Sequence, residues 1–208
     1  MEAFTIVTGA AAWLPRANVD TDIIIRIERL TASTGREQLG RYALEALRYR
    51  EDGSDDPDFI LNQPAFRGAP ILLAGDNFGC GSSREGAVWA LRSMGVRCVI
   101  APSFGDIFFS NCFQNGTLPI RLPAADIELL AKACADGAAL TVDLLQGLLT
   151  TADGIVIPFF TDPLRRENLM HGLDDIGLTL KDDPLIRTWQ ADDRQRRPWA
   201  WPAARTRP

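Results

Sequence analysis

The most constraining feature of the sequence is a βαβ pattern in its middle. Residues 70–75 read Pro-Ile-Leu-Leu-Ala-Gly and residues 96–101 read Val-Arg-Cys-Val-Ile-Ala, two short apolar runs typical of buried strands. Between them, apolar residues at helical spacing predict a helix over 83–94, which Gly95 ends. Strands joined by such a helix are parallel, so the sequence predicts an α/β fold with a mixed, partly parallel sheet.

Strand and helix patterns continue on both sides of this unit. The predicted elements are strands at 4–8, 118–122 and 154–158, a strand or other buried element at 23–25, a helix within 26–50, an acidic turn at 51–58, and helices at 106–113 and 126–134. The last helix is expected to turn Leu129, Leu130 and Ala133 inward. At 208 residues, the chain is expected to form a single domain, with residues 183–208 as a C-terminal extension that wraps its surface.

Composition and charge exclude several classes of protein. The sequence has 27 acidic and 22 basic residues, a formal net charge of −5, which disfavours a nucleic-acid partner held by phosphate contacts. It has no run of about 18 apolar residues, so no membrane-spanning helix is expected. It also lacks the basic segment typical of a secretory signal, which predicts a cytoplasmic location.

The residues that commonly bind metals are few and scattered. The four cysteines, Cys80, Cys98, Cys112 and Cys134, form no Cys-x-x-Cys pair, and His171 is the single histidine. A zinc site or an iron–sulfur cluster needs clustered thiolates or imidazoles. The chain is therefore expected to bind no metal or cofactor of its own, and any metal chemistry has to come from elsewhere.

The segment Gly75–Glu85, Gly-Asp-Asn-Phe-Gly-Cys-Gly-Ser-Ser-Arg-Glu, is the main candidate for a functional site. It is a glycine-rich turn between a strand and a helix, where free N–H groups and the helix dipole favour an anion. Its spacing fits neither familiar phosphate-binding loop, because Arg84 stands third after Gly81 and no Gly-Lys-Ser/Thr is present. A small carboxylate is therefore the expected ligand.

Two interpretations of this stretch are open from the residues alone. Ser82 and Glu85 match the Ser-x-x-Glu capping box, a common structural motif at helix starts. A capping box does not explain Arg84, a cation in the first helical turn, where the dipole disfavours it by up to about 1 kcal/mol. A guanidinium that forks onto a substrate carboxylate does explain it, so a ligand-binding role is favoured.

Other polar residues have simpler explanations. Asp20 and Asp22 could hold a divalent metal, but two carboxylates make a weak site, and an Asx-turn that leads into the isoleucines is favoured. Asn111 and Asn115 lie one helical turn apart, and helix termination before a glycine accounts for Asn115. Cys80, within the glycine-rich turn, is expected near the ligand.

Five motifs together resemble one family. In chain order they are Asn18-Val-Asp-Thr-Asp-Ile, Asn77-Phe-Gly-Cys-Gly-Ser-Ser-Arg-Glu, Phe104-Gly-Asp-Ile-Phe, Asn115-Gly-Thr-Leu-Pro-Ile and Gly172-Leu-Asp-Asp-Ile-Gly-Leu-Thr-Leu. They resemble the small subunits of 3-isopropylmalate dehydratases, in the aconitase superfamily, over nearly the whole chain. The resemblance implies an aconitase-type swivelling β/β/α domain that closes over the active site of a large subunit carrying a [4Fe–4S] cluster.

The resemblance also implies a reaction and residue roles. The family isomerises 2-isopropylmalate and 3-isopropylmalate by dehydration and rehydration in leucine biosynthesis, as a heterodimer or heterotetramer of large and small subunits. Ser82 falls where the family places the serine base that takes a proton from the carbon next to a carboxylate, and Ser83 and Arg84 fall where the small dicarboxylate substrate binds. Further substrate-binding candidates are Gly81, Cys80 and Arg26, and supporting candidates are Asp20, Asp22 and Asn77.

The sequence departs from the family pattern at two positions. Gly86 stands where the family usually has histidine, and Arg26 stands where it usually has proline. Two alternatives therefore stay open: a paralogous dehydratase of another 2-alkylmalate or a dimethylmalate, and a non-catalytic anion-binding or regulatory module. Residues 26–38 are expected to form a mobile loop that selects the alkyl substituent of the substrate.

Overall fold

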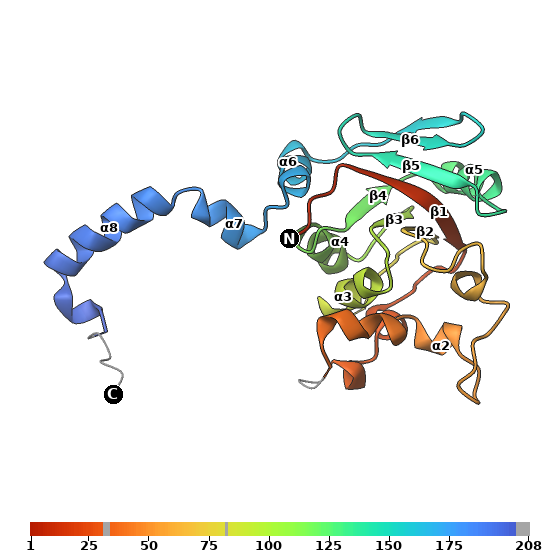
Figure 1. Cartoon of the computed structure of the whole chain (residues 1–208), viewed down its shortest axis with the longest axis horizontal. Coiled ribbons are helices and arrows are strands. Elements are labelled where there is room, and N and C mark those ends of the chain that lie inside the picture. Colours follow the sequence, from red (N-terminus) through yellow and green to blue (C-terminus); the bar gives the residue numbers. More distant parts are fainter. Residues whose placement is uncertain (31–33, 82, 203–208) are drawn as a thin grey trace. The chain divides into compact units, whose positions relative to one another are not determined.

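The structure is a computed structural model that describes residues 1–30, 34–81 and 83–202 (Figure 1). It divides into two compact units, Met1–Gly172 and Leu173–Pro208. The first unit holds one seven-stranded sheet and two hydrophobic core clusters. Among the described residues, no helix combines the length and the apolar character needed to cross a membrane.

The sheet of the first unit has the strand order β4-β3-β2-β1-β5-β6-β7. Its strands are β1 Ile6–Leu14, β2 Ile71–Ala74, β3 Cys98–Ala101, β4 Leu118–Arg121, β5 Ala139–Asp143, β6 Leu148–Thr151 and β7 Val156–Pro158. Neighbours from β1 to β4 pair in parallel, and neighbours from β1 through β5 to β7 pair antiparallel. The predicted mixed, partly parallel sheet is confirmed, with β1 at the junction of its two halves.

The parallel half forms because apolar strands alternate with helices. Helix α3, Gly86–Ser93, joins β2 to β3, and α4, Asp106–Gln114, joins β3 to β4. Every residue of β2 and β3 is buried, as expected for strands covered on both faces. Leu72 of β2 pairs in parallel register with Val99 of β3, so the predicted βαβ unit is confirmed.

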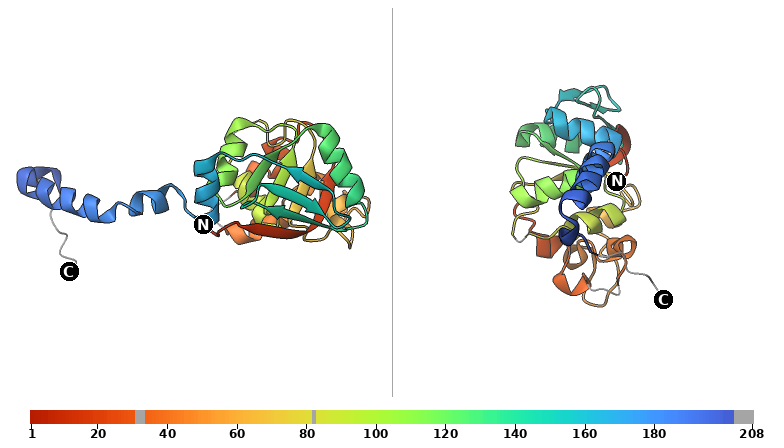
Figure 2. Two further views of the ribbon diagram at one scale, coloured as in Figure 1. Left: turned by 90° about the horizontal axis from the view of Figure 1, so that it is seen from above. Right: turned by 90° about the vertical axis from the view of Figure 1, so that its left-hand side faces the viewer.

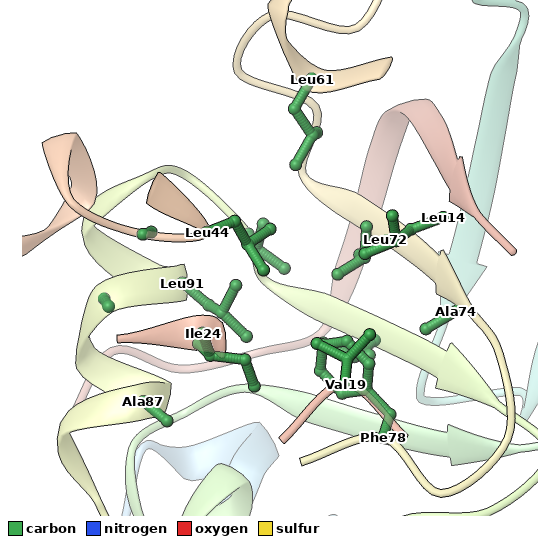
Figure 3. Packing of buried hydrophobic residues seen from close by; sticks show 14 of the residues in the cluster. Leu14, Val19, Ile24, Leu44, Leu61, Leu72, Ala74, Phe78, Ala87 and Leu91 are labelled. Carbon is green, nitrogen blue, oxygen red and sulfur yellow. The ribbon is translucent and has the colours of Figure 1, made fainter. Parts of the chain in front are cut away.

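Different helices cover the two faces of the sheet, with α1 and α3 on one face and α5 on the other. The other helices of this unit are α1 Thr21–Ile24, α2 Glu45–Arg48, α5 Ala124–Ala133 and α6 Pro163–His171, with 3₁₀ turns at Ile27–Arg29, Arg36–Arg41 and Ile60–Asn62. Successive strand residues point to opposite faces. Leu72 therefore joins one core cluster with Ile24 of α1 and Leu91 of α3 (Figure 3). Leu73 joins the other cluster, with Leu130 of α5.

The antiparallel half is built differently. Strands β5, β6 and β7 follow one another along the chain and lie side by side in the sheet (Figure 2). Leu140 and Val142 of β5 are buried, whereas Ala139 is exposed and Thr141 is half-buried. This alternation is typical of an antiparallel sheet with one solvated face.

Two predicted elements near the amino terminus differ from the structure. The strand expected at 4–8 extends to Leu14, because pairing with both β2 and β5 outweighs the weak strand propensity of Gly9 and the alanines that follow. The isoleucines at 23–25 form no strand. They end the short helix α1, and Ile24 and Ile25 are fully buried, as expected for the alternative of a buried element.

Two helix predictions are also corrected. The single helix expected within 26–50 is present but short: α2 has four residues, Leu44 precedes it with a left-handed φ of 56°, and the other helical turns among the described residues of this stretch are 3₁₀. Leu129 of α5, expected to face inward, is 43% exposed. Its neighbour Leu130 is buried, so the apolar face of α5 is narrower than predicted.

The second unit is helical. It contains α7 Asp175–Leu180, α8 Asp183–Arg196 and a 3₁₀ turn at Pro198–Ala200. The carboxylate of Asp193 accepts from Arg197 Nε at 2.7 Å and from Trp201 Nε1 at 3.0 Å. Since residues 203–208 lie outside the described part of the chain, the extension expected at 183–208, and its wrapping of the surface, stay predictions.

Candidate functional site

The candidate site lies at the carboxyl ends of the parallel strands. β1, β2 and β3 end at Leu14, Ala74 and Ala101, at one edge of the sheet. Parallel α/β sheets bind ligands at this edge, because each strand delivers a loop and a helix start there. The glycine-rich segment Gly75–Glu85 follows β2, which lies between the other two strands.

Backbone hydrogen bonds fasten this segment between its neighbours. On one side, the Gly79 N–H donates to the Val19 carbonyl at 2.7 Å. On the other side, the Phe78 N–H donates to the Ser103 carbonyl at 3.0 Å. The Ser103 hydroxyl oxygen also accepts from the Asn77 N–H at 2.9 Å. Groups from two loops, one after β1 and one after β3, therefore hold the turn.

Left-handed backbone conformations shape the turn. Asn77, Gly79 and Gly81 have φ angles of 56°, 71° and 90°. A side chain at position 79 would collide with the ring of Phe108, so glycine is required there. Asparagine adopts a left-handed φ more readily than most residues, and Asn77 Nδ2 donates to Asn18 Oδ1 at 2.8 Å. Asn77 thus ties the turn to the loop after β1.

Asp20 and Asp22 lie at the start of α1, beside this turn. Asp20 Oδ1 accepts from the Ile23 N–H at 2.7 Å and so caps α1, in agreement with the predicted turn role. The Thr21 N–H donates to the Cys80 carbonyl at 3.0 Å, which brings α1 against the glycine-rich segment. Asp22 is then placed to pair with a side chain of that segment.

That side chain is Arg84. Its Nη1 pairs with Asp22 Oδ1, and the Arg84 side chain is 20% exposed against 58% for Asp22. The rest of the planar guanidinium keeps N–H donors for a ligand carboxylate. Because α3 begins at Gly86, Arg84 precedes the helix, and its expected placement in the first helical turn is wrong. The main electrostatic partner of the Arg84 guanidinium is therefore the Asp22 carboxylate, and not the positive end of the α3 helix dipole.

The capping-box interpretation is wrong as well. Glu85 occupies the N-cap position of α3 instead of the third helical position, and it makes no side-chain cap hydrogen bond. The helix starts three residues later than expected, because the segment up to Arg84 is tied to α1. Ser82, the candidate base, lies outside the described residues, and Gly81 and Ser83 on either side of it are exposed.

Cys80 lies in the turn as a half-buried thiol. Burial, and then the nearby Asp20 carboxylate, raise the pKa of this thiol. Cys80 is therefore a protonated side chain at neutral pH rather than a nucleophilic thiolate. The other three cysteines are buried, and burial raises the pKa of each. Across the described ranges, no group of three or more His, Cys, Asp or Glu side chains could hold a metal ion.

Arg26 contacts a different part of the molecule. Its Nε lies 3.5 Å from Glu45 Oε1, and the same carboxylate pairs with Arg29 at 3.0 Å. Arg26 lines a cavity of about 690 Å³ together with Tyr42, and no described residue of the glycine-rich turn lines that cavity. The structure thus places Arg26 beside Glu45.

Gly86, the position where the family usually has histidine, is buried against Leu30. A Cβ atom at position 86 would lie 2.6 Å from Leu30 Cδ1, so a larger residue requires Leu30 to move. Leu30 belongs to the expected loop at 26–38, of which residues 31–33 lie outside the described part of the chain. The role of this loop in substrate selection stays a prediction.

Sequence reasoning missed two residues that shape the site. Asn18 and Ser103 bind Asn77 from opposite sides, and the Ser103 hydroxyl also donates to the Asp76 carboxylate. Ser103 comes two residues after the predicted strand at 96–101, and therefore at the same sheet edge as the glycine-rich turn. Its place just after a predicted parallel strand was therefore a sequence signal that Ser103 lies at the site.

Known proteins share this sequence and fold. The family described as "Aconitase C-terminal domain" matches residues 1–125. The 3-isopropylmalate dehydratase small subunits of Rhodospirillum centenum and Paracoccus denitrificans are 52% and 50% identical over 96% of this chain, and over 99% and 100% of their own lengths. A crystal structure of 3-isopropylmalate dehydratase from Methanocaldococcus jannaschii, 29% identical, matches with a TM-score of 0.65 over 89% of this chain and 99% of that chain. The chain therefore belongs to the aconitase C-terminal domain family and, within it, to the small subunits of 3-isopropylmalate dehydratases.

Proposed function

We propose that the chain is the small subunit of a hydro-lyase that interconverts 2-isopropylmalate and 3-isopropylmalate in leucine biosynthesis. The observation that carries the proposal is the turn at the carboxyl ends of the parallel strands, where Asp22 holds Arg84 beside the exposed Ser83. Identity of 50–52% to dehydratase small subunits supports this substrate over another alkylmalate. It also supports a catalytic role over a non-catalytic anion-binding module.

In this proposal the turn binds the substrate through a carboxylate. The guanidinium of Arg84 forks onto that carboxylate, and the Ser83 hydroxyl donates to it. The backbone at Gly81 and the protonated thiol of Cys80 line the same surface. The supporting residues Asp20, Asp22 and Asn77 hold the turn in place through the contacts described above. Arg26, which lines the cavity beside Glu45, stays a predicted substrate-binding residue.

Ser82 is the proposed base, a role that rests on the family resemblance. It takes the proton from the carbon next to a substrate carboxylate during dehydration and returns a proton during rehydration. A serine hydroxyl is a weak base unless its alkoxide is stabilised. The N–H groups ahead of α3 and the positive charge of Arg84 supply such stabilisation, and closure against a partner strengthens it by excluding water.

The proposed partner is a large subunit that carries a [4Fe–4S] cluster. Relatives that are named small subunits imply a large-subunit partner. The cysteines of this chain fit such a cluster poorly, because three are buried and burial raises the pKa of all four. When bound in the large subunit, the cluster supplies a Lewis acid for the departing hydroxyl group. We expect a cytoplasmic heterodimer or heterotetramer without nucleic-acid or membrane partners.

Anaerobic co-expression with an aconitase-like large subunit tests the proposal. The two subunits together should interconvert the isopropylmalates, and each alone should be inactive. Other 2-alkylmalates and dimethylmalate should show at least about tenfold lower kcat/KM. Stoichiometric iron and sulfide in the purified single chain, or a preference for another alkylmalate, would contradict the proposal.

A further inference from the structure

Glu85 links the candidate site to a hydrogen-bond network outside it. It follows Arg84 directly in the chain and caps α3 without any side-chain bond to that helix. Its Oε1 accepts instead from Asn115 Nδ2 at 2.8 Å. Asn115 is the C-cap residue of α4, so this bond ties the end of one helix to the start of another.

The amide of Asn115 has a single orientation that satisfies this network. Trp89 Nε1 lies 3.0 Å from Asn115 Oδ1, and because an indole N–H only donates, Oδ1 has to face Trp89. Nδ2 then faces Glu85, and it also donates to the Asn111 carbonyl at 2.9 Å. Both N–H groups and the oxygen are used. Aspartate has the same shape but no N–H, so it cannot replace asparagine here.

Trp89 extends the network to the 3₁₀ turn Arg36–Arg41. The Arg36 guanidinium lies 3.7 Å from the centre of the Trp89 ring, within range of a cation–π interaction. Further along α3, the Ser93 hydroxyl oxygen accepts from the Gly40 N–H at 2.9 Å. Helix α3 is therefore held on one side by this turn and on another by α4.

We propose that Asn115 is a positioning residue that sets the direction of Ser83 and Arg84 through its bond to Glu85. The inference rests on the proposed function, in which those two residues bind the substrate carboxylate. Asp22 holds the Arg84 side chain, and Asn115 holds the residue that follows it. The positions of Ser83 and Arg84 matter for activity, because a misplacement of about 1 Å of a group that positions the substrate can cost about a hundredfold in rate.

Asn115→Asp in the assembled complex tests this inference. The aspartate still accepts from Trp89, but its second oxygen meets the Glu85 carboxylate, and the two anions repel each other. We expect KM for 3-isopropylmalate to rise about tenfold, with a smaller change in kcat. Adding Glu85→Gln puts an N–H donor back between the two residues and should bring KM to within about threefold of wild type. The matched control Gln146→Glu adds the same charge at an exposed position in the turn after β5 and should leave KM unchanged.

A purely structural role for Asn115 predicts another pattern. The free chain would then melt at a lower Tm, while KM of the assembled complex would not move. That result would overturn the inference, and so would a raised KM that Glu85→Gln does not reverse.

Trp89→Phe provides the test if the Asn115→Asp chain does not fold. It keeps a ring for Arg36 but removes the donor that orients Asn115. A raised KM supports the inference, and an unchanged KM overturns it.

Arg84→Lys, measured alongside, separates the proposed function from the positioning role of Asn115. If it leaves KM unchanged, the proposed function fails; if it raises KM while Asn115→Asp does not, only the positioning role of Asn115 fails.

Discussion

The two halves of the sheet differ in construction and in content. Strands β1 to β4 are parallel, and the central pair β2 and β3 is buried along its whole length. Strands β5 to β7 are antiparallel and alternate buried with partly exposed residues. All described residues of the candidate turn, together with Asp20 and Asp22, come from segments that directly follow the parallel strands β1 and β2.

The difference follows from how the strands are connected. Parallel strands need helical crossovers, so each delivers a loop to the same edge, and the loops after β1 and β3 hold the glycine-rich turn after β2 between them. Antiparallel strands return directly, so their loops are divided between two edges. The parallel half is therefore expected to carry the chemistry, and the antiparallel half to contribute stability.

The largest effect on activity is expected from Ser82→Ala. The complex should assemble normally and lose at least about a hundredfold in kcat, the lower end for acid–base groups. Steady-state kinetics on the purified complex provides the measurement. Ser82→Asn is a second variant, because asparagine keeps a polar side chain that can form hydrogen bonds but provides no alkoxide. Near-native kcat in the Ser82→Asn complex would remove Ser82 from the mechanism.

Leu149→Ala, in the antiparallel half, is expected to lower stability without lowering kcat. Leu149 of β6 is fully buried, so its truncation should cost about 2–5 kcal/mol of unfolding free energy. Denaturant titration of the free chain measures this loss. The kcat of fully assembled complex should stay within about twofold of wild type. A large fall in kcat would show that the site is not confined to the parallel half.

Arg84→Lys should raise KM at least about tenfold, because a lysine point charge cannot reproduce the planar fork on a carboxylate. The kcat should change less. Asp143→Asn, which removes a charge in the antiparallel half, should leave KM as it is. Equal KM values for the Arg84→Lys and wild-type complexes would contradict a carboxylate-binding role.

The smallest effect is expected from Thr141→Ala. The hydroxyl groups of Thr141 and Thr8 lie 3.0 Å apart across β5 and β1. Loss of such a cross-strand pair should lower the unfolding free energy by about 0.2–1 kcal/mol. Thermal unfolding measures this change, and unchanged kinetics of the complex would agree with a purely structural role for this half.

Much of the parallel half could be predicted from the sequence. The strands at 70–75 and 96–101 and the turn between them follow from apolar runs, helical spacing and glycines, which are local signals. Their convergence at one edge follows from the topology of a βαβ unit alone. The location of the candidate site was therefore predictable before any side chain was placed.

Pairings between distant loops could not be predicted in this way. Two side-chain contacts join segments far apart in sequence: the ion pair between Arg84 and Asp22, and the hydrogen bond between Glu85 and Asn115. The start of α3 at Gly86 accompanies these contacts. The extension of β1 to Leu14 likewise depends on its partners on both sides. Local propensity contains no information about such partners.

Cys80 offers the most direct test that the glycine-rich turn is the working surface. Cys80 is half-buried whereas the other three thiols are buried, and labelling at about pH 9 increases its thiolate fraction, which its raised pKa keeps low at neutral pH. Mass spectrometry should show rapid alkylation of Cys80 in the free chain and strong further protection when 3-isopropylmalate is added to the complex. A thiol introduced by Ala139→Cys on β5 should not respond to substrate. Equal Cys80 labelling with and without substrate would contradict a site at the parallel edge of the sheet.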